Sequence, residues 1–442
     1  WGSYFGPYGY MVDANGNKVD AKNDIAYRKQ AGTDHDVTTF ARLNGYLNAE
    51  IIKGLNLQAD FTYDLTNRNN EWHYLPVYCW NTWGGNISAP SYAVSQSSTY
   101  QTQTNTKISR WTTNVFATYE KSFNKAHNLK VMAGFTADQE QNRYFNAKRT
   151  ILNDNNLPEL NLATGTQTVT SSASHWATAG FFGRINYDYK GIYLLEVNGR
   201  YDSSSKFPLD KQWGFFPSMS AGYRFSEEAY FEPIRDIVNN GKLRFSWGEV
   251  GNDNIGSYSF IPTISSIPAG SMYWTDGKNK IAGAYMPELV SSDLSWERVR
   301  TLGVGIDLGF LNNSLTVGFD WFQRDTKDMI AYGVALPDAL GATAPLTNAG
   351  SLRSRGWELS VNYNHRFGKV NFYVNAILSD YTTKVTEWNN PTRSIGSYYS
   401  GMNYGDIWGF ETDRYFEESD FVGKNSDGSW ISGWTTSSVM SV

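Results

Sequence analysis

The stretch TLGVGIDLGFLNNSLTVGFDWFQR, residues 301–324, alternates apolar and polar side chains almost without interruption. A period of two indicates β-strands, because successive side chains of a strand point to opposite faces. Asn312 and Asn313 stand between the two alternating halves, and asparagine accepts the positive φ that a type I′ turn requires. The stretch therefore predicts two antiparallel strands joined by a two-residue turn.

This turn determines which side chains lie opposite one another. Ile306 would pair with Phe319, so the apolar side chains of both strands share one face. Asp307 and Asp320 would then share the other face, together with glycines. The stretch ELSVNYNHRFGKVNFYVNAILS, residues 358–379, predicts the same arrangement around a turn at Gly368 and Lys369. Each hairpin thus has one apolar and one polar face.

The same alternation recurs along the chain and predicts about twelve strands, most of them long enough to cross a bilayer when tilted. The regular ones are 54–66, 127–138, 192–202, 213–225, 241–248, 301–310, 313–325, 356–367 and 369–379, and the less regular ones lie near 40–50, 108–121 and 174–189. Charged side chains in the middle of these strands fall on the polar face, which we expect to line a wet lumen. The candidates are Asp60, Glu196, Arg200, Arg244, Asp307, Asp320 and Glu358.

Composition excludes several classes of function. The net charge of −5 leaves no excess of positive charge to neutralise nucleic acid. The single Cys79 cannot form an intrachain disulfide or a thiolate metal site, and the histidines lack zinc-binding spacing. The chain contains no phosphate-binding loop and no G-x-S-x-G nucleophile motif. We therefore predict no enzyme activity, no cofactor and no metal.

The connections between the predicted strands alternate between short and long. Tight connections occur near 51–54, 122–127, 190–191, 311–314 and 367–370, with a moderate one at 226–240. Between them in the order of the chain come the long connections, 68–107, 143–172, 203–212, 250–295 and 326–352. A meander with two unlike ends is typical of bacterial outer-membrane barrels. One short helix is expected at 226–238, with Ser226 as its N-cap and Pro233 within it. No apolar run is long enough for a transmembrane helix.

A soluble antiparallel sheet, sandwich or propeller would show similar alternation, with its apolar face buried in a core. Three features favour a transmembrane barrel instead. The polar face is rich in Asn, Asp, Arg and Gly, the apolar face carries aromatic residues near strand ends, and the connections alternate in length. A basic residue on the lipid face in mid-bilayer costs about 2 to 4 kcal/mol, so a membrane barrel requires its charged residues to stay on the other face.

Aromatic residues in the long connections are candidates for binding a substrate, because flat rings stack on sugars and pack against peptides. Packing of the loops themselves is the alternative role for each ring. The candidates are Trp72, Tyr74, Tyr78, Trp80, Trp83, Tyr273 and Trp274.

Five segments resemble a known family. They are NGRYDSSSKFPLDKQWGFFPSMSAGYRFSEEAYF (198–231), KLRFSWGEVGNDNIGSYSF (242–260), LSWERVRTLGVGIDLGFLNNSLTVGFDWFQRDTKDMI (294–330), NAGSLRSRGWELSVNYN (348–364) and GDIWGFETDRYF (405–416). In this order they resemble SusC/RagA-type TonB-dependent outer-membrane transporters of Bacteroidota. The resemblance covers nearly the whole chain.

The resemblance implies an all-β, up-and-down antiparallel barrel of about 22 strands, an N-terminal plug, a TonB-contacting segment and a SusD-like surface lipoprotein that closes the mouth. It implies import of oligosaccharides or peptides across the outer membrane, with the long loops extracellular and with SusC–SusD pairs that can dimerise. No plug is recognisable here, so residues 1–442 are expected to be an internal part of the barrel domain, without plug or C-terminal strands. A passive porin or adhesin barrel and a soluble β-rich carbohydrate-binding protein are the alternatives.

Overall fold

The fold is built on one large antiparallel sheet. A computed structural model describes residues 10–13, 15–80, 90–267, 282–333, 336–409, 415, 417–424, 426, 428 and 430–432. Its main sheet has 12 strands in the order β18-β17-β16-β15-β12-β11-β10-β9-β8-β7-β4-β3, which is an up-and-down meander. The strands are β3 (Asp34–Ile52), β4 (Leu55–Tyr74), β7 (Tyr100–Phe123), β8 (His127–Thr150), β9 (Gln167–Tyr189), β10 (Tyr193–Ser204), β11 (Trp213–Tyr223), β12 (Val238–Asn252), β15 (Glu297–Phe310), β16 (Leu315–Tyr332), β17 (Leu346–Phe367) and β18 (Val370–Glu387).

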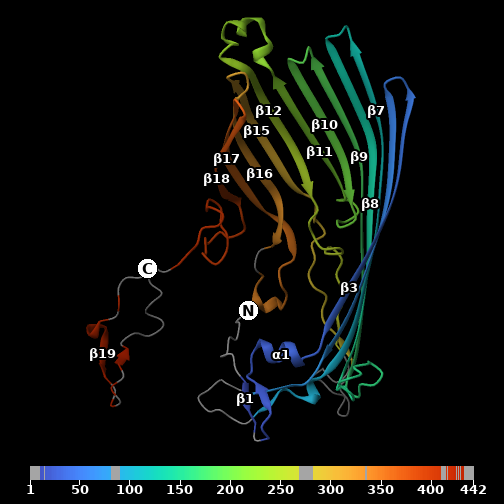
Figure 1. The fold of residues 1–442 in the computed structure, drawn as a ribbon, viewed down its shortest axis with the longest axis vertical. Helices are drawn as coiled ribbons and strands as arrows, with labels where there is room; N and C mark the ends of the chain where they lie inside the picture. The colour runs from blue at the N-terminus through green and yellow to red at the C-terminus, as the bar shows by residue number, and fades with distance from the viewer. Residues whose placement is uncertain are drawn as a thin grey trace.

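The sheet curls along its length and stays open between β3 and β18 (Figure 1). Tight hairpin turns gather at one end, which we call the turn end, and the longer connections leave from the other, the loop end. Both the predicted number of strands and the predicted alternation of connections are confirmed. The described sheet is thus an incomplete barrel wall with two unlike ends.

The register predicted for residues 301–324 is confirmed. Ile306 lies opposite Phe319. Asn312 and Asn313 adopt positive φ angles of 56° and 63°, as a type I′ turn requires. Leu311 also has a positive φ of 54°, which the sequence did not predict. The second hairpin agrees as well, with Leu359 opposite Leu378.

The apolar face of the sheet is uncovered. Large apolar side chains on alternate positions of neighbouring strands stay exposed, and no described segment packs over the middle of this band. Among them are Phe61, Val115, Phe181, Ile185, Leu195, Val197, Leu243, Val304, Phe319 and Leu378. An apolar band of this extent is unfavourable in water and fits a lipid environment. We call these positions the outward row.

Aromatic side chains bound the outward row at both ends. Toward the turn end, the rings of Tyr193 and Tyr223 stack with centroids 5.1 Å apart. Toward the loop end, Tyr201 and Trp213 stack at 4.7 Å, and Phe181 lies 6.4 Å from Trp213. Aromatic girdles at two levels are characteristic of membrane–water interfaces.

Several strands extend well past this belt at the loop end. On β4 the outward row is apolar up to Leu65 and then continues with Asn67, Asn69 and Glu71. Beyond the belt both faces are polar, so the period-two signal fades although the strand goes on. For this reason the predicted strands near 108–121 and 127–138 were too short: β7 and β8 each have 24 residues.

The connection from β11 to β12 at the turn end differs from the predicted helix. It forms two short 3₁₀ helices, η2 (Phe225–Glu227) and η3 (Ala229–Ile234), with Pro233 inside η3. Ser226 lies within η2 and is not an N-cap. Proline in the last turn removes a backbone donor and disfavours a continuous α-helix, which accounts for the difference.

A small folded unit precedes β3 at the loop end. Helix α1 (Asp24–Gln30), which the sequence did not predict, has Asn23 as its N-cap, and the Asn23 side chain accepts hydrogen bonds from the backbone of Ile25 and Ala26. It packs on a core that includes Cys79, and burial raises the pKa of that thiol, so Cys79 acts as a small apolar residue. The remaining elements are β1 (Tyr10–Val12), β2 (Lys18–Asp20), β5 (Val77–Cys79), β6 (Ser91–Val94), η1 (Gln96–Ser98), β13 (Ser266–Ile267), β14 (Gly283–Ala284), η4 (Asp338–Leu340), η5 (Glu418–Asp420), β19 (Phe421–Lys424) and β20 (Trp430–Ser432).

No helix in the described part of the chain is long and apolar enough to cross a membrane.

The two faces of β4 provide a test of this membrane placement. Phe61 is on the outward row, and its neighbour Thr62 faces the other side between Asp60 and Asp64. Phe61→Arg should lower the free energy of unfolding in lipid by about 2 to 4 kcal/mol, whereas Thr62→Arg should have little effect. Denaturant unfolding of the full-length protein in bilayers, followed by heat-modifiable gel migration, measures both. Equal sensitivity of the two positions would contradict the assignment of faces.

Candidate functional site

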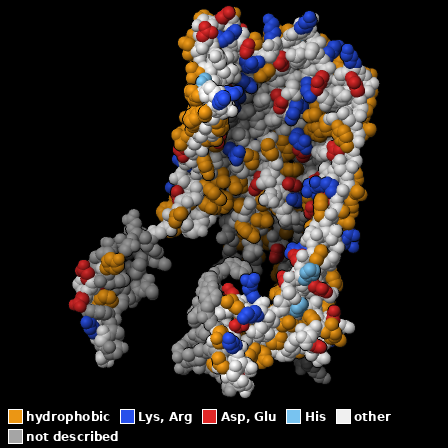
Figure 2. Space-filling view, in the orientation of Figure 1, with side chains coloured by type: hydrophobic (Ala, Val, Ile, Leu, Met, Phe, Trp, Pro, Cys, Tyr) orange, Lys and Arg blue, Asp and Glu red, His pale blue; other side chains and the backbone are white. Residues whose placement is uncertain are grey.

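The polar face of the sheet is its concave face. A hollow of about 680 Å³, which we call the turn-side hollow, is bordered by residues from β7 to β16. Strands so far apart in the sheet can border one hollow only on its concave side. Glu196, Arg244 and Asp320 are among the residues that line it. Figure 2 shows the molecule hollowed along its length, with charged side chains on the walls of the hollow and apolar ones along its outer margins.

Arg244 connects three strands in this hollow. Its Nε donates to Asp307 Oδ2 at 2.7 Å, and its Nη2 donates to Asp307 Oδ1 at 2.9 Å and to Asp320 Oδ2 at 2.8 Å. Because Arg244 is on β12 and Asp320 on β16, the guanidinium must cross β15. It crosses at Gly305, where an added Cβ would overlap Asp320 Oδ1 and lie 2.8 Å from Arg244 Nη2. This glycine therefore has a steric role in the polar network.

The other predicted lumen residues also take part in contacts across strands. Asn114 donates to Asp60 at 2.9 Å. Glu196 accepts hydrogen bonds from Asn186 and Asn198, at 2.5 and 2.8 Å. Their hydrogen-bond partners are carboxamides, and Glu196 also forms an ion pair with Arg184, whose Nε lies 3.9 Å from Glu196 Oε1.

Arg200 donates to Asp202 through two nitrogens, at 3.0 and 2.8 Å. Glu358 lies opposite Asp320 in the register, and Ser379 lies opposite Glu358. That these side chains face the lumen of a complete barrel stays a prediction, as does any role in transport.

A second hollow, the loop-side hollow, has a volume of about 480 Å³ and includes Arg200 and Glu249 in its lining. Glu249 is buried and accepts hydrogen bonds from both Arg298 and Arg300. Sequence reasoning missed this cluster, because Glu249 follows Phe245 and Trp247 at the spacing of the apolar face. The direct pairing of β11 with β12 ends at Ser218 and Gly248. Beyond that point β11 no longer fixes which face of the sheet the side chains of β12 occupy.

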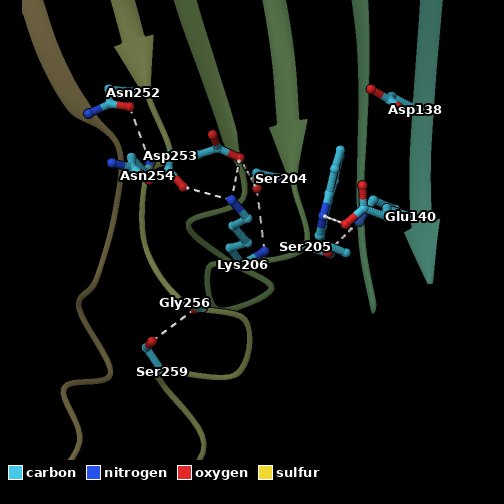
Figure 3. A network of polar contacts seen from close by, with 12 residues as sticks. Asp138, Glu140, Ser204, Ser205, Lys206, Asn252, Asp253, Asn254, Gly256 and Ser259 are labelled. Atoms are coloured by element: carbon cyan, nitrogen blue, oxygen red, sulfur yellow. Dashed lines mark hydrogen bonds and ion pairs between the residues drawn. The ribbon is translucent and has the colours of Figure 1, made fainter. Parts of the chain in front are cut away.

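A polar network ties the ends of β9, β10 and β12 together near the loop-side hollow (Figure 3). Lys206 Nζ lies 3.1 Å from the carbonyl oxygen of Asp253, and Ser204 Oγ donates to Asp253 Oδ2 at 2.8 Å. Trp176 Nε1 donates to Glu140 at 3.3 Å. Each contact joins segments distant in the sequence, so the network fixes the shape of the loop end. Among the described residues no group of three His, Cys, Asp or Glu is arranged to hold a metal ion.

The structure brings two of the candidate aromatic residues together and adds a third. Trp72 and Tyr74, expected in a loop, lie at the end of β4. Both contact Tyr100, with ring centroids 5.1 and 5.4 Å away. Lys148 Nζ lies 3.7 Å from the centre of the Tyr100 ring. We call Trp72, Tyr74, Tyr100 and Lys148 the aromatic ledge. By strand alternation it lies on the polar face of the wall, beyond the membrane belt.

The other candidate aromatics lie elsewhere. Tyr78 is on β5 and contacts Tyr92 at 5.0 Å, so it belongs to the small folded unit. Trp80 follows β5 and forms an isolated bridge with Ala21. Trp83, Tyr273 and Trp274 lie outside the described residues. Sequence reasoning did not identify Tyr100 as part of this cluster, because it falls in a stretch that was expected to be a loop.

Residues 2–441 match the profile of the family described as TonB dependent receptor-like, beta-barrel. The chain belongs to this family. It is a family of outer-membrane barrels that act as receptors and transporters rather than as enzymes. The predicted fold class and the SusC/RagA resemblance are therefore confirmed.

Individual relatives agree with the family assignment. TonB-dependent receptor P39 of Formosa agariphila is 28% identical over 368 residues, which cover 81% of this chain and 33% of the relative. TonB-dependent receptor SusC of Bacteroides thetaiotaomicron is 32% identical over 201 residues, 44% of this chain and 19% of SusC. The chain spans about a third of the length of the relatives that it matches over most of its own length.

A solved structure shares the fold. The RagAB peptide importer in its closed-closed state superposes with a TM-score of 0.76 at 20% identity, over 98% of this chain and 46% of the importer chain. At this level of identity the likeness concerns the fold alone.

Gly305 offers a test of the polar network. Gly305→Ala should separate Arg244 from Asp320 and lower the free energy of unfolding by about 1 to 3 kcal/mol, as overpacking does. Gly183→Ala on the outward row is a control for replacing a strand glycine without overlap, since a Cβ there would meet only Met132 O at an ordinary 3.7 Å. Denaturant unfolding in bilayers measures both variants. An unchanged Gly305→Ala protein would show that the crossing is not constrained.

Proposed function

We propose that this chain supplies part of the barrel of an outer-membrane importer that takes up oligosaccharides or peptides. Energy would come from TonB through a plug encoded outside residues 1–442, and a SusD-like lipoprotein would act at the loop end, which faces the cell exterior. Membership in the TonB-dependent receptor family is the observation that carries this proposal. The names SusC and RagAB among the relatives support the choice of partner and cargo.

The geometry of the concave face is consistent with this role. The turn-side and loop-side hollows follow one another along the wall, and both are lined by apolar as well as charged and polar residues. The charged side chains suit a plug domain and a hydrated cargo better than a wholly apolar ligand. The ion pairs that line it, including Arg244 with Asp320, are partly exposed and so contribute modestly to stability. Their larger contribution is to the polarity of the passage.

Substrate contacts are assigned to the loop end. We propose the aromatic ledge as the first contact surface, because Trp72 keeps 40% of its surface exposed there. Its rings are held by one another and by Lys148, so little conformational freedom would be lost on binding. The remaining predicted contacts are Tyr78, Trp80, Trp83, Tyr273 and Trp274, and they keep that status as proposals.

Energy dependence tests the importer function. In a Bacteroidota host that relies on the full-length protein, uptake of the cognate oligosaccharide or peptide should stop when TonB is deleted or when the proton gradient is collapsed. The SusD-like lipoprotein should copurify with the barrel in detergent. Uptake that persists without TonB would identify a passive pore instead.

The ledge is tested separately by binding. Trp72→Ala and Tyr100→Ala should each weaken affinity for the transported ligand about tenfold, which corresponds to about 1.4 kcal/mol. Phe145→Ala is the control, because Phe145 is also exposed on the same wall but occupies the opposite face of β8. Calorimetry on the purified full-length protein measures all three. Equal loss in the control, or none in the ledge variants, would remove the ledge from the binding surface.

A further inference from the structure

The connection between β11 and β12 is unlike the other connections at the turn end. Most neighbouring strands there are joined by a few residues, whereas residues 224–237 form η2 and η3 between Tyr223 and Val238. Figure 1 shows this segment as a separate lobe at the tip of the sheet. A segment of this size has a surface of its own, and its contacts indicate where that surface lies.

The lobe folds onto the outward row and not into the hollow. Gly241 occupies an outward position opposite Leu308, and a Cβ there would overlap the ring of Phe225. Phe225 in turn contacts the buried Phe231, with ring centroids 5.2 Å apart. The base of the lobe is therefore packed against the lipid-facing side of β12.

Hydroxyl groups of the turn-end girdle hold the lobe in place. The hydroxyl groups of Tyr223 and Tyr230 lie 2.6 Å apart, and Tyr193 donates to Glu228 at 2.6 Å. Both Tyr193 and Tyr223 belong to the outward row. The lobe is thus continuous with the aromatic girdle that marks the edge of the lipid belt.

The shape of the lobe is further restrained by its own polar contacts. Arg235 Nη2 donates to Ser226 O at 2.7 Å and lies 3.4 Å from Glu228 O. Asn239, at the start of β12, donates to Arg235 O at 2.9 Å and accepts a hydrogen bond from the backbone of Asn312 at 2.5 Å, so it joins the lobe to the next turn. Pro233 fixes the backbone of η3 from within. The lobe is therefore a defined structure with a defined outer surface.

That outer surface is apolar where it continues the outward row. Tyr230, Ile234 and Ile237 keep 65%, 46% and 68% of their surfaces exposed, although Phe231 between them is buried. Leu311 on the adjoining turn is exposed as well. Several large apolar side chains exposed on a short, rigid segment are unfavourable in water and indicate that the segment contacts a partner.

We propose that this lobe is an interfacial anchor: Tyr230, Ile234 and Ile237 insert at the headgroup boundary of the leaflet on the turn side. The partner is lipid because the lobe is continuous with the lipid-facing row, shares hydrogen bonds with its girdle, and is far too short to cross a bilayer. Its exposed acidic residues, Glu232 and Asp236, remain available to water and to headgroups. An amphipathic segment of this kind lies in the interface with its apolar side toward the acyl chains.

Site-directed spin labelling of the full-length protein in phosphatidylethanolamine-containing nanodiscs tests the proposal. Nitroxides are attached at Ile234→Cys and at Ile237→Cys, with the unsubstituted protein as the labelling background because Cys79 is buried. Leu243→Cys on the outward row provides the lipid reference, and Leu209→Cys, exposed at the loop end, provides the aqueous reference. Heat-modifiable migration verifies that each labelled variant is folded.

Labels at Ile234 and Ile237 should collide with oxygen several times more often than with a water-soluble nickel chelate, as at Leu243. A ratio like that of Leu209 would place the lobe in water and overturn the proposal. Protection from both reagents would also overturn it, because it would mean that protein covers the lobe. The result does not depend on whether the protein imports anything.

Discussion

Everything in this structure depends on the separation of the two faces of one sheet. A β-strand presents its side chains alternately, so each strand can face lipid on one side and water on the other only if its sequence keeps a period of two. The chain keeps this period through the belt, where Phe319 and Leu359 lie outward while Asp320 and Glu358 lie inward on the same strand pair. Lipid enforces the separation, because a charge on the wrong face would be buried without a partner.

The inward face is organised by side chains that cross strands. Arg244 reaches Asp320 over Gly305, and Phe116 and Phe182 meet over Gly134 in the same manner. A glycine on the central strand lets side chains of its two neighbours come into contact. The concave face is thus a packed surface, polar around Arg244 and aromatic around Gly134. The alternation of glycine with aspartate in residues 301–324 reflects this geometry.

The loop end is organised differently because it lies beyond the lipid belt. Beyond the belt the strands are polar on both faces, and the aromatic ledge, the Lys206 network and the unit around α1 are held by specific contacts. The turn end shows the opposite case, in which the lobe at Tyr230 extends the apolar face past the last strand residue. The two ends differ because both faces are polar at the loop end, whereas the lobe at the turn end continues the apolar outward row.

The approximate positions of the strands, the register of the hairpins at 301–324 and 358–379, and the sorting of charges by face followed from the sequence, because alternation and turn chemistry act over a few residues and the bilayer penalises any slip. Of the candidate site, sequence alone identified Arg244, Asp307 and Asp320 as one polar face and Trp72 and Tyr74 as aromatic candidates. Only the tertiary structure joined Trp72 to Tyr100, Glu249 to Arg298, and Phe225 to Gly241. Those contacts bring together residues far apart in the sequence or beyond the lipid belt, where no local pattern records which surface a side chain will meet.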